Sequence, residues 1–397
     1  MKRIFASLFF ATATAQIGLG IISPILPLYA KTFAATGLQI GLVFAAFSIS
    51  RAVLGPFVGR LSDRIGRKPL ILAGLAVYAA VSVLYAVAAN LWQLGIFRFV
   101  QGIASVMVTP IAQAYVGDLT PPGSEGRTLN AFYASQFIGM AIGPVLGGGI
   151  GAAWSYEASF LVMGALSVVS LVLVALTVPM DETAKSRHQP RKSAMMPFRQ
   201  VMQNDAVKAM SIYFATRGFW RQAFSAFYPL YAVAAFAASE ADIGLILSVY
   251  TFTEGLLQIP FGYLADRYPR VRQIVIGSVF APLVLLAIPY VGSVWGVALL
   301  TVAMGAFSAL GRASLVAIRT ELGRSHGMGT LAGVQGSAFA TGQMLGPLAG
   351  GAVVDAAGLW AVFPFGSLIG CIGTGLVIVW IRRWAKKDPE AAESHGA

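Results

Sequence analysis

Five charged side chains interrupt long apolar runs, and they are the residues best placed to do chemistry in a low-dielectric environment. These residues are Arg51, Arg98, Arg217, Arg221 and Glu254. Burial raises the pKa of a carboxyl group, and a neighbouring arginine lowers it again. Because Glu254 is the only acid deep inside such a run, it can accept a proton and thereby open a salt bridge. A static ion pair that holds two helices together is the alternative interpretation.

The same apolar runs contain amides and aromatic rings that could line a cavity. Amides avoid lipid, so they are expected to face the protein interior. Four of the five buried charges are positive, which favours neutral, zwitterionic or anionic compounds over cations. Arg312 lies near the end of its run and is expected to extend to the membrane surface. The predicted cavity combines Arg51, Arg217 and Arg221 with Gln101, Gln113, Tyr133, Gln136, Phe224, Tyr228, Tyr250, Gln335, Phe339 and Gln343.

The elements that must hold these residues are membrane-spanning helices. The chain has 397 residues, of which 57% are hydrophobic, and only 11% are charged. Repeated apolar stretches of about 20 residues are typical of transmembrane helices. The polar breaks divide the chain into twelve spans, at 4–29, 38–59, 70–89, 92–116, 128–150, 156–178, 207–235, 242–262, 272–291, 293–317, 329–352 and 359–381.

The distribution of basic residues predicts the orientation of these spans. Segments on one side contain 22 of the 28 Lys and Arg residues, whereas the loops on the other side contain only Lys31. Basic loops stay in the cytoplasm, so both termini are expected there, in a multi-pass protein of the plasma (inner) membrane. The net charge of +12 therefore reflects membrane topology, and nucleic acid is not an expected partner.

Cysteine and histidine usage argues against a metal site or a cofactor. The single cysteine, Cys371, excludes an internal disulfide and a cysteine-based metal cluster. The histidines, His188, His326 and His395, all lie in polar segments. No grouping of His, Asp, Ser or Cys near a membrane face suggests catalysis. A polytopic membrane enzyme is therefore the least favoured class.

The chain divides into two halves around one long polar stretch. We expect an N-terminal six-helix bundle at 1–180 and a C-terminal one at 207–387. The segment 181–206 reads as a cytoplasmic linker, with a short interfacial helix at 195–203. The remaining residues, 388–397, read as a disordered cytoplasmic tail.

The two halves repeat at a nearly constant offset of 203 residues. Chance matches of common residues would not keep one offset over several spans, so this is a parallel duplication, an architecture known in transporters. Arg51 and Glu254 occupy equivalent positions but have opposite charges. The matched positions include Gly59 with Gly262, Asp63 with Asp266, Gly102 with Gly305, Asp118 with Glu321, and IGPVLGG at 142–148 with LGPLAGG at 345–351.

The stretch GRLSDRIGRKPL at 59–70 places many charges between two spans. Arg64, Arg67 and Lys68 fit the anionic cytoplasmic leaflet. Topology does not explain Asp63, but a carboxylate at a helix end can bind the positive N-terminus of a neighbouring helix. The second copy, GYLADRYPRVRQ at 262–273, has Pro269 in place of the second glycine, so we expect the first copy to be the stronger gate.

This loop resembles the signature of the major facilitator superfamily. RFVQG at 98–102, IGMAIGPVLGGGIG at 138–151 and IGLGIISPILP at 17–27 resemble motifs of its drug:proton antiporters. The resemblance implies an all-α fold of twelve transmembrane helices in two pseudo-symmetric bundles. It also implies that Asp63 contacts the start of the eleventh span, near 327–329, when the cytoplasmic side is closed. The implied gate comprises Gly59, Asp63, Arg64, Gly66, Arg67, Asp118, Asp266 and Arg267.

The antiporter motif of the fifth span comprises Gly139, Gly143, Pro144, Gly147 and Gly148. Glycines at every fourth position form one smooth helix face. We expect this face to pack against the eighth span and to seal the transport path against proton leak.

The resemblance implies a proton-coupled exporter of small amphipathic compounds or drugs, with Arg98 in proton coupling. The residues themselves suggest Glu254 as the proton acceptor, and we expect a monomer. Its partners would be the substrate, protons and the lipid bilayer. A proton symporter or facilitator that takes up a polar metabolite is the alternative.

Overall fold

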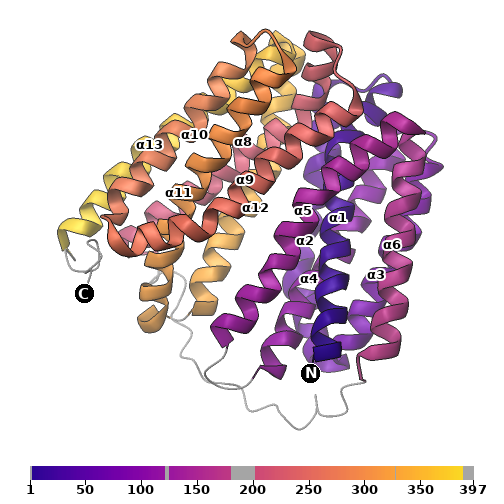
Figure 1. Cartoon of the computed structure of the whole chain (residues 1–397), viewed down its shortest axis with the longest axis horizontal. Coiled ribbons are helices and arrows are strands. Elements are labelled where there is room, and N and C mark those ends of the chain that lie inside the picture. The colour runs from indigo at the N-terminus through magenta and orange to yellow at the C-terminus, as the bar shows by residue number, and fades with distance from the viewer. Residues whose placement is uncertain (1, 121–124, 180–201, 327, 388–397) are drawn as a thin grey trace. The chain divides into compact units, whose positions relative to one another are not determined.

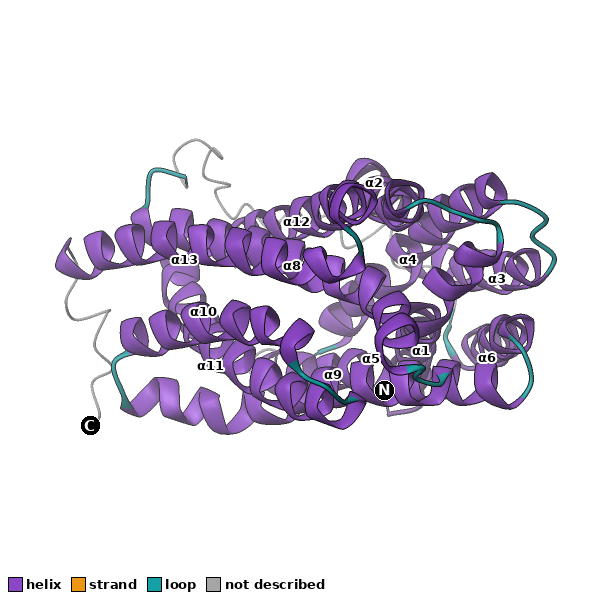
Figure 2. Cartoon of the chain, turned by 90° about the horizontal axis from the view of Figure 1, so that it is seen from above, coloured by secondary structure: helices purple, strands orange, loops and turns teal. Residues whose placement is uncertain are grey.

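The computed structural model describes residues 2–120, 125–179, 202–326 and 328–387. The described residues form twelve long helices and no strand (Figure 2). The interfacial helix expected at 195–203 lies almost entirely outside them, as does the tail at 388–397. The helices are α1 (Lys2–Thr32), α2 (Gly37–Ile65), α3 (Arg67–Ala86), α4 (Leu91–Leu119), α5 (Glu125–Ala153), α6 (Tyr156–Thr177), α8 (Asp205–Phe236), α9 (Glu240–Arg267), α10 (Arg270–Ala287), α11 (Val294–His326), α12 (Met328–Ala357) and α13 (Val362–Lys387).

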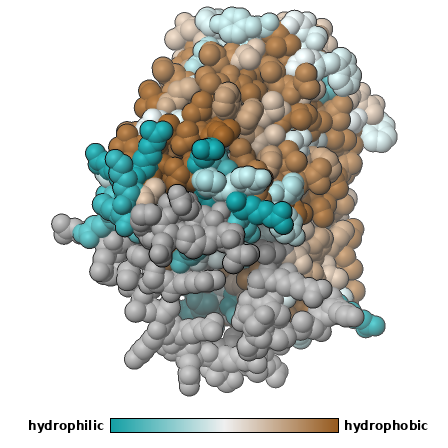
Figure 3. All heavy atoms as spheres, turned by 60° about the vertical axis from the view of Figure 1, so that its left-hand side comes forward, coloured by the Kyte–Doolittle hydropathy of each residue, from teal (hydrophilic) through white to brown (hydrophobic). Residues whose placement is uncertain are grey.

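Ten of these helices are long and apolar enough to cross a membrane. The other two, α8 and α12, contain more polar residues, among them Arg217 and Arg221 in α8 and Gln335 and Gln343 in α12. On the face drawn in Figure 3, hydrophobic side chains form a broad band with hydrophilic side chains along its border. Such a band fits a lipid environment. The twelve-helix, all-α fold expected from the sequence is confirmed.

The polar breaks of the sequence supply caps for the helices. Thr36 Oγ1 accepts a hydrogen bond from the Gln39 amide at 3.3 Å before α2, and Asn90 Oδ1 does the same for the Gln93 amide before α4. Ser155 caps α6 in the same way. Such side chains satisfy backbone donors that the first helical turn leaves free. Short polar segments therefore set where each span begins.

The turn between α2 and α3 requires a glycine. Gly66 has a φ of 94° and donates its backbone N–H to Ser62 O at 3.0 Å. Residues with a Cβ rarely adopt this conformation. In the equivalent turn of the second copy, Pro269 has a φ of −54° and precedes α10. The two loop motifs are therefore equivalent in sequence but turn differently.

The helices group into two compact units. The first contains the described residues within Met1–Gln189 and Ala232–Ser248, and the second those within Pro190–Tyr231 and Val249–Ala397. Residues 232–248 thus pack with the first unit, although they follow the expected linker.

In the first unit, α1 packs along α5, α2 along α4, and α3 against both α4 and α6 (Figure 1). In the second unit, α10 packs against α11 and α13. Apolar side chains fill both interiors. The first core includes Leu75, Tyr78, Tyr115 and Phe132, and the second includes Met210, Tyr213, Ile274, Leu315 and Trp384.

Candidate functional site

Glu254 lies between two arginines in the second unit. Arg217 of α8 donates from Nη2 to Glu254 Oε1 of α9, and Arg312 Nη1 of α11 lies 3.1 Å from the same oxygen. Glu254 is 2% exposed and Arg217 is 4% exposed. One buried carboxylate therefore neutralises part of the charge of two guanidinium groups from two other helices.

The expectation that Arg312 extends to the membrane surface is wrong. Its position near the end of an apolar run suggested that interpretation, but Arg312 points inward and forms an ion pair with Glu254. Only a three-dimensional arrangement of α9 and α11 shows this pairing.

Equivalent glycines let neighbouring helices approach at the charged positions of both units. A Cβ at Gly305 of α11 would lie 2.9 Å from Tyr250 O and 3.2 Å from the Glu254 amide of α9. In the first unit, a Cβ at Gly102 of α4 would lie 2.6 Å from Phe47 O of α2. Because Phe47 and Tyr250 are 203 residues apart, the two contacts are repeat equivalents. These glycines hold α11 against Glu254 and α4 against the turn of α2 before Arg51.

Aromatic rings cover the arginines of the second unit. The Arg221 guanidinium lies 5.6 Å from the centre of the Tyr250 ring, and that of Arg217 lies 5.6 Å from the Phe339 ring. Phe224 stacks on Tyr228, with ring centres 5.0 Å apart. Cation–π contacts of this kind stabilise a positive charge where water is scarce. The predicted cavity residues of α8 and α9 are thus brought together.

In the first unit, Arg98 forms its hydrogen bond with an uncharged side chain and shares an aromatic ring with Arg51. Its Nη1 donates to Gln101 Oε1 at 2.7 Å, and Tyr85 Oη donates to the same oxygen at 3.2 Å. The Arg98 guanidinium lies 4.5 Å from the centre of the Phe47 ring, and that of Arg51 lies 5.3 Å from it. Arg98 is 4% exposed. The first unit therefore holds two arginines, one buried and one half-buried, over the same phenylalanine ring.

The other predicted amides form polar pairs within their own unit. In the first unit, Gln113 Nε2 donates to Tyr133 Oη, and Gln136 pairs with Gln16 at 3.5 Å. The partner of Gln136 was missed, although it lies in the first apolar run. In the second unit, Gln335 accepts from Arg319 at 2.6 Å and Gln343 donates to Gln222 at 3.2 Å.

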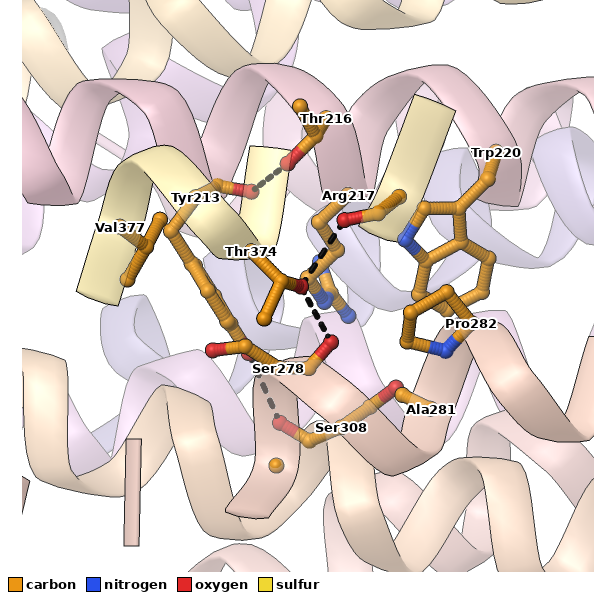
Figure 4. A pocket seen from close by; sticks show the side chains of 12 residues that line it. Tyr213, Thr216, Arg217, Trp220, Ser278, Ala281, Pro282, Ser308, Thr374 and Val377 are labelled. Atoms are coloured by element: carbon orange, nitrogen blue, oxygen red, sulfur yellow. Dashed lines mark hydrogen bonds between the residues drawn. The ribbon is translucent and has the colours of Figure 1, made fainter. Parts of the chain in front are cut away.

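A small cavity lies beside Arg217 in the second unit (Figure 4). Its lining comes from α8, α10, α11 and α13, and Tyr213 donates across it to Ser308 O at 3.3 Å. Its volume of about 20 Å³ has room for about one water molecule. Of the predicted cavity residues only Arg217 contributes to it, so this cavity is not a site for an organic substrate.

Three of the predicted gate residues, Arg67, Asp118 and Asp266, form ion pairs. Arg67 Nη2 lies 2.6 Å from Asp118 Oδ2 in the first unit. In the second, Arg270 lies 2.6 Å from Glu321 and 3.8 Å from Asp266. The side chains of Asp63, Arg64 and Arg267 are exposed. The role of Asp63 as a latch stays a prediction.

The structure packs α5 against α9, the eighth span, as expected, but this contact does not run through the row of every fourth glycine. A Cβ at Gly139, Gly143 or Gly147 would meet the backbone of α1, not α9. A different face of α5 approaches α9: Gly148 faces Glu240 and Gly244. The Val145 amide also donates to Ser248 Oγ at 3.0 Å. The period of four identified a contact face correctly, but a period alone does not identify the neighbour.

Comparison with known proteins decides the family. The family model described as "Major Facilitator Superfamily" matches residues 8–231 and 209–396, which together span most of the chain. The chain belongs to the Major Facilitator Superfamily. It is thus a multi-pass integral membrane protein of a transporter family, and its resemblance to the drug:proton antiporters has support among its relatives.

Two curated relatives within the superfamily cover almost the whole chain. The protein is 26% identical to "Quinolone resistance protein NorA" of Staphylococcus aureus, over 96% of this chain and 97% of the relative. It is 24% identical to "Multidrug resistance protein 2" of Bacillus subtilis, over 98% of each chain.

Two solved structures share the fold. A bacterial homologue of the lysosomal transporter Spinster, in an inward-facing conformation, has a TM-score of 0.81 at 15% identity, over 96% of this chain and 97% of that one. The nucleoside transporter NupG has a TM-score of 0.79 at 15% identity, over 96% and 98% of the two chains. At such identities the likeness concerns the fold alone.

Proposed function

We propose that this superfamily member is a proton-coupled exporter of small amphipathic organic compounds. The printed names of its two relatives concern drug resistance, and both relatives align along nearly the full chain. The antiporter-like motif of α5 supports the same direction of transport. In this proposal the two bundles alternate access to a central substrate path, both termini are cytoplasmic, and the protein acts as a monomer in the plasma membrane.

The observation that carries proton coupling is the position of Glu254 between Arg217 and Arg312. An intramembrane carboxylate is costly unless it is paired, and such groups often mark proton pathways. When Glu254 is ionised, it holds α8, α9 and α11 together through one oxygen. When it is protonated, the attraction to both guanidiniums is lost and these helices are free to rearrange. The alternative is a permanent pair without a transport role.

The balance of intramembrane charge supports the proposed substrate class. Arg51, Arg217 and Arg221 lie near the middle of their helices and Arg98 lies about two turns inside α4. Among the described residues, Glu254 is the single acid at such depth. With Arg312 now placed beside Glu254, the excess of positive charge is larger than the sequence indicated. A lipophilic cation would be repelled, so we propose neutral, zwitterionic or anionic substrates.

Transport into everted membrane vesicles tests proton coupling. An imposed pH gradient should drive uptake by the wild-type protein, and Glu254→Gln should abolish this while leaving downhill exchange. Glu240→Gln is the matched control, because Glu240 begins the same helix and accepts a hydrogen bond from Tyr156 at 3.0 Å. Normal pH-driven transport by Glu254→Gln would leave only the permanent-pair interpretation.

A stability measurement on the same variants separates a coupling role from a structural one. Removing one partner of a buried ion pair costs about 3–5 kcal/mol, whereas removing both costs less. If Glu254→Gln combined with Arg217→Gln and Arg312→Gln, which removes all three charges, regains thermal stability without regaining pH-driven transport, the carboxylate is needed for coupling. Restored transport would contradict the proposal.

A second candidate function is uptake of a polar metabolite by symport or facilitation. The amide pairs Gln136–Gln16 and Gln343–Gln222 offer hydrogen bonds that suit such a substrate. Accumulation of a polar compound by right-side-out vesicles, together with no transport of amphiphiles by everted ones, would favour this function.

A further inference from the structure

Two arginines of the first unit lie on one phenylalanine ring. The guanidinium carbons of Arg51 and Arg98 lie 5.3 Å and 4.5 Å from the centre of the Phe47 ring. Arg51 and Phe47 are one turn apart on α2, and Arg98 reaches the ring from α4. The close approach of α4 to α2 at Gly102 fixes this arrangement.

Neither arginine forms an ion pair with an acid among the described residues. The described acids of the first unit all lie near helix ends, where Asp118 pairs with Arg67, Glu240 accepts from Tyr156, and Asp242 accepts from Ser239. Asp63 and Glu157 likewise lie in terminal turns. The contrast with the second unit is direct, because Arg217 and Arg312 share Glu254 there.

The groups around the two arginines stabilise their positive charges but carry no negative charge that would neutralise them. Gln101 accepts one hydrogen bond from Arg98, and the Phe44 and Phe47 rings offer their negative faces. The Nε–H of Arg98 is buried and has no hydrogen-bond partner. Buried charges in proteins are normally paired. Arg51 and Arg98 therefore carry two positive charges, and the Nε–H of Arg98 is an unused hydrogen-bond donor. This combination suits the binding of an anion.

We propose that Arg51 and Arg98 bind the anionic group of the transported compound, a carboxylate in the simplest case. Arg51 is half-buried and Arg98 is buried, so the anion would meet Arg51 first and then reach the free donor of Arg98. Guanidinium groups match the planar geometry of a carboxylate and can bind it through two hydrogen bonds. The Phe47 and Phe44 rings would contact the apolar part of the compound.

This inference rests on the proposed function and adds that the two units have different roles in it. Arginine does not lose its proton in proteins, so the site of the first unit stays positive at every physiological pH. Glu254 of the second unit can change its charge. The inference therefore assigns Arg98, which the family resemblance places in proton coupling, to recognition of the substrate's charge together with Arg51, and it leaves proton binding to Glu254 of α9.

A matched pair of probes tests the anion site. Nalidixate is an amphipathic aromatic carboxylate, and its methyl ester has nearly the same shape without the charge. We expect purified wild-type protein in phosphatidylcholine nanodiscs to bind nalidixate at least about tenfold more tightly than the ester, by isothermal titration calorimetry, since hydrogen bonds to charged groups contribute roughly 1.5–3 kcal/mol.

Substitutions assign this preference to the two arginines. Arg51→Gln and Arg98→Gln should bind the acid and the ester equally, whereas Arg51→Lys should keep part of the preference for the acid. Lys31→Gln is the control: it removes one positive charge from an exposed residue of an outer loop, and this variant should keep the full wild-type preference for the acid. Gel filtration and thermal unfolding show whether each variant is folded. If Arg98→Gln does not fold, the two Arg51 variants still decide the result.

The outcomes separate this inference from the proposed function. Glu254→Gln should retain the wild-type preference for the acid while losing pH-driven transport. The anion site is overturned if the wild-type protein binds both probes equally or neither, or if Arg51→Gln keeps the wild-type ratio. A retained preference without pH-driven transport in the wild-type protein would instead overturn proton coupling and leave the anion site standing.

Discussion

Arg67 and Asp118 form an ion pair with 2.6 Å between Nη2 and Oδ2, and the pair is repeated 203 residues later. Arg270 lies 2.6 Å from Glu321 in the second unit. Each arginine begins a helix, α3 or α10, and each acid lies near the end of the next long helix, α4 or α11. The duplication seen in the sequence thus extends to individual contacts, with Asp in one copy and Glu in the other.

The two arginines should differ in their contribution to stability. The side chain of Arg67 is 20% exposed and that of Arg270 is 9% exposed, and Arg270 Nε also donates to Ala265 O at 3.0 Å. We expect Arg67→Gln to cost about 1 kcal/mol or less and Arg270→Gln about 1–3 kcal/mol. Thermal unfolding in detergent measures both, with exposed Arg272→Gln as the control. Equal losses would contradict this ranking.

Asp63 is predicted to act in the conformational cycle and not in substrate binding. Asp63→Asn should lower the transport rate by about tenfold, since a carboxylate at a helix N-terminus contributes roughly 0.3–2 kcal/mol. Expression and substrate affinity should stay at wild-type levels. Transport assays and calorimetry on the same preparation separate the two effects.

The equivalent variant in the second copy is the control for Asp63. Asp266 lies 3.8 Å from Arg270, and we expect Asp266→Asn to reduce transport less than Asp63→Asn. An unchanged transport rate in Asp63→Asn would remove the latch from the mechanism.

Two glycines of α5 should respond differently to the same substitution. A Cβ at Gly143 would lie 2.6 Å from Gly20 Cα of α1, whereas a Cβ at Gly149 would meet nothing within 4 Å. Gly143→Ala must push α1 and α5 apart, at a cost of about 1–3 kcal/mol. Gly149→Ala should be neutral or slightly stabilising, because alanine favours a helix. The melting temperatures of the two variants test this. A similar decrease in both would show that the close α1–α5 contact at Gly143 does not determine the effect of the substitution.

Acid should weaken the contact between the start of α8 and the end of α13. Lys387 Nζ donates to Asp205 at 2.7 Å and Lys208 donates to it at 3.2 Å. The hydrogen bond from Lys387 lowers the pKa of Asp205 from its ordinary value of 3.8. A lowered pKa stabilises the folded state fully above that ordinary value, and the stabilisation is lost as pH falls through the folded pKa.

The comparison of wild-type protein with Asp205→Asn measures this dependence. The wild type should be more stable at pH 7 by about 1 kcal/mol or less, since Lys387 is exposed, and the difference should shrink below pH 3.8. Lys387→Gln should remove most of the same difference. If the stability difference between the wild type and Asp205→Asn persists in acid, the asparagine destabilises the protein for reasons other than its missing charge.

The sequence was sufficient for the features that depend on local pattern. Apolar run lengths predict the twelve helices, the constant offset predicts the repeat, and the isolation of Glu254 among arginines predicts a buried ion pair. Contacts between distant helices were harder to predict. Arg312 and the α1 partner of Gly143 depend on which helix faces which, and the position of a residue within its own run carries no such information.

The repeat equivalence of Arg51 and Glu254 has a consequence for the history and redesign of the chain. A protein made of two copies of residues 1–180 would keep the glycine contact at Gly102, the Arg67–Asp118 pair and the guanidiniums on Phe47. It would have no intramembrane group that can change its charge. Under the proposed mechanism, the first copy carries a fixed positive charge at this place, and the second carries a carboxylate that a single proton can neutralise.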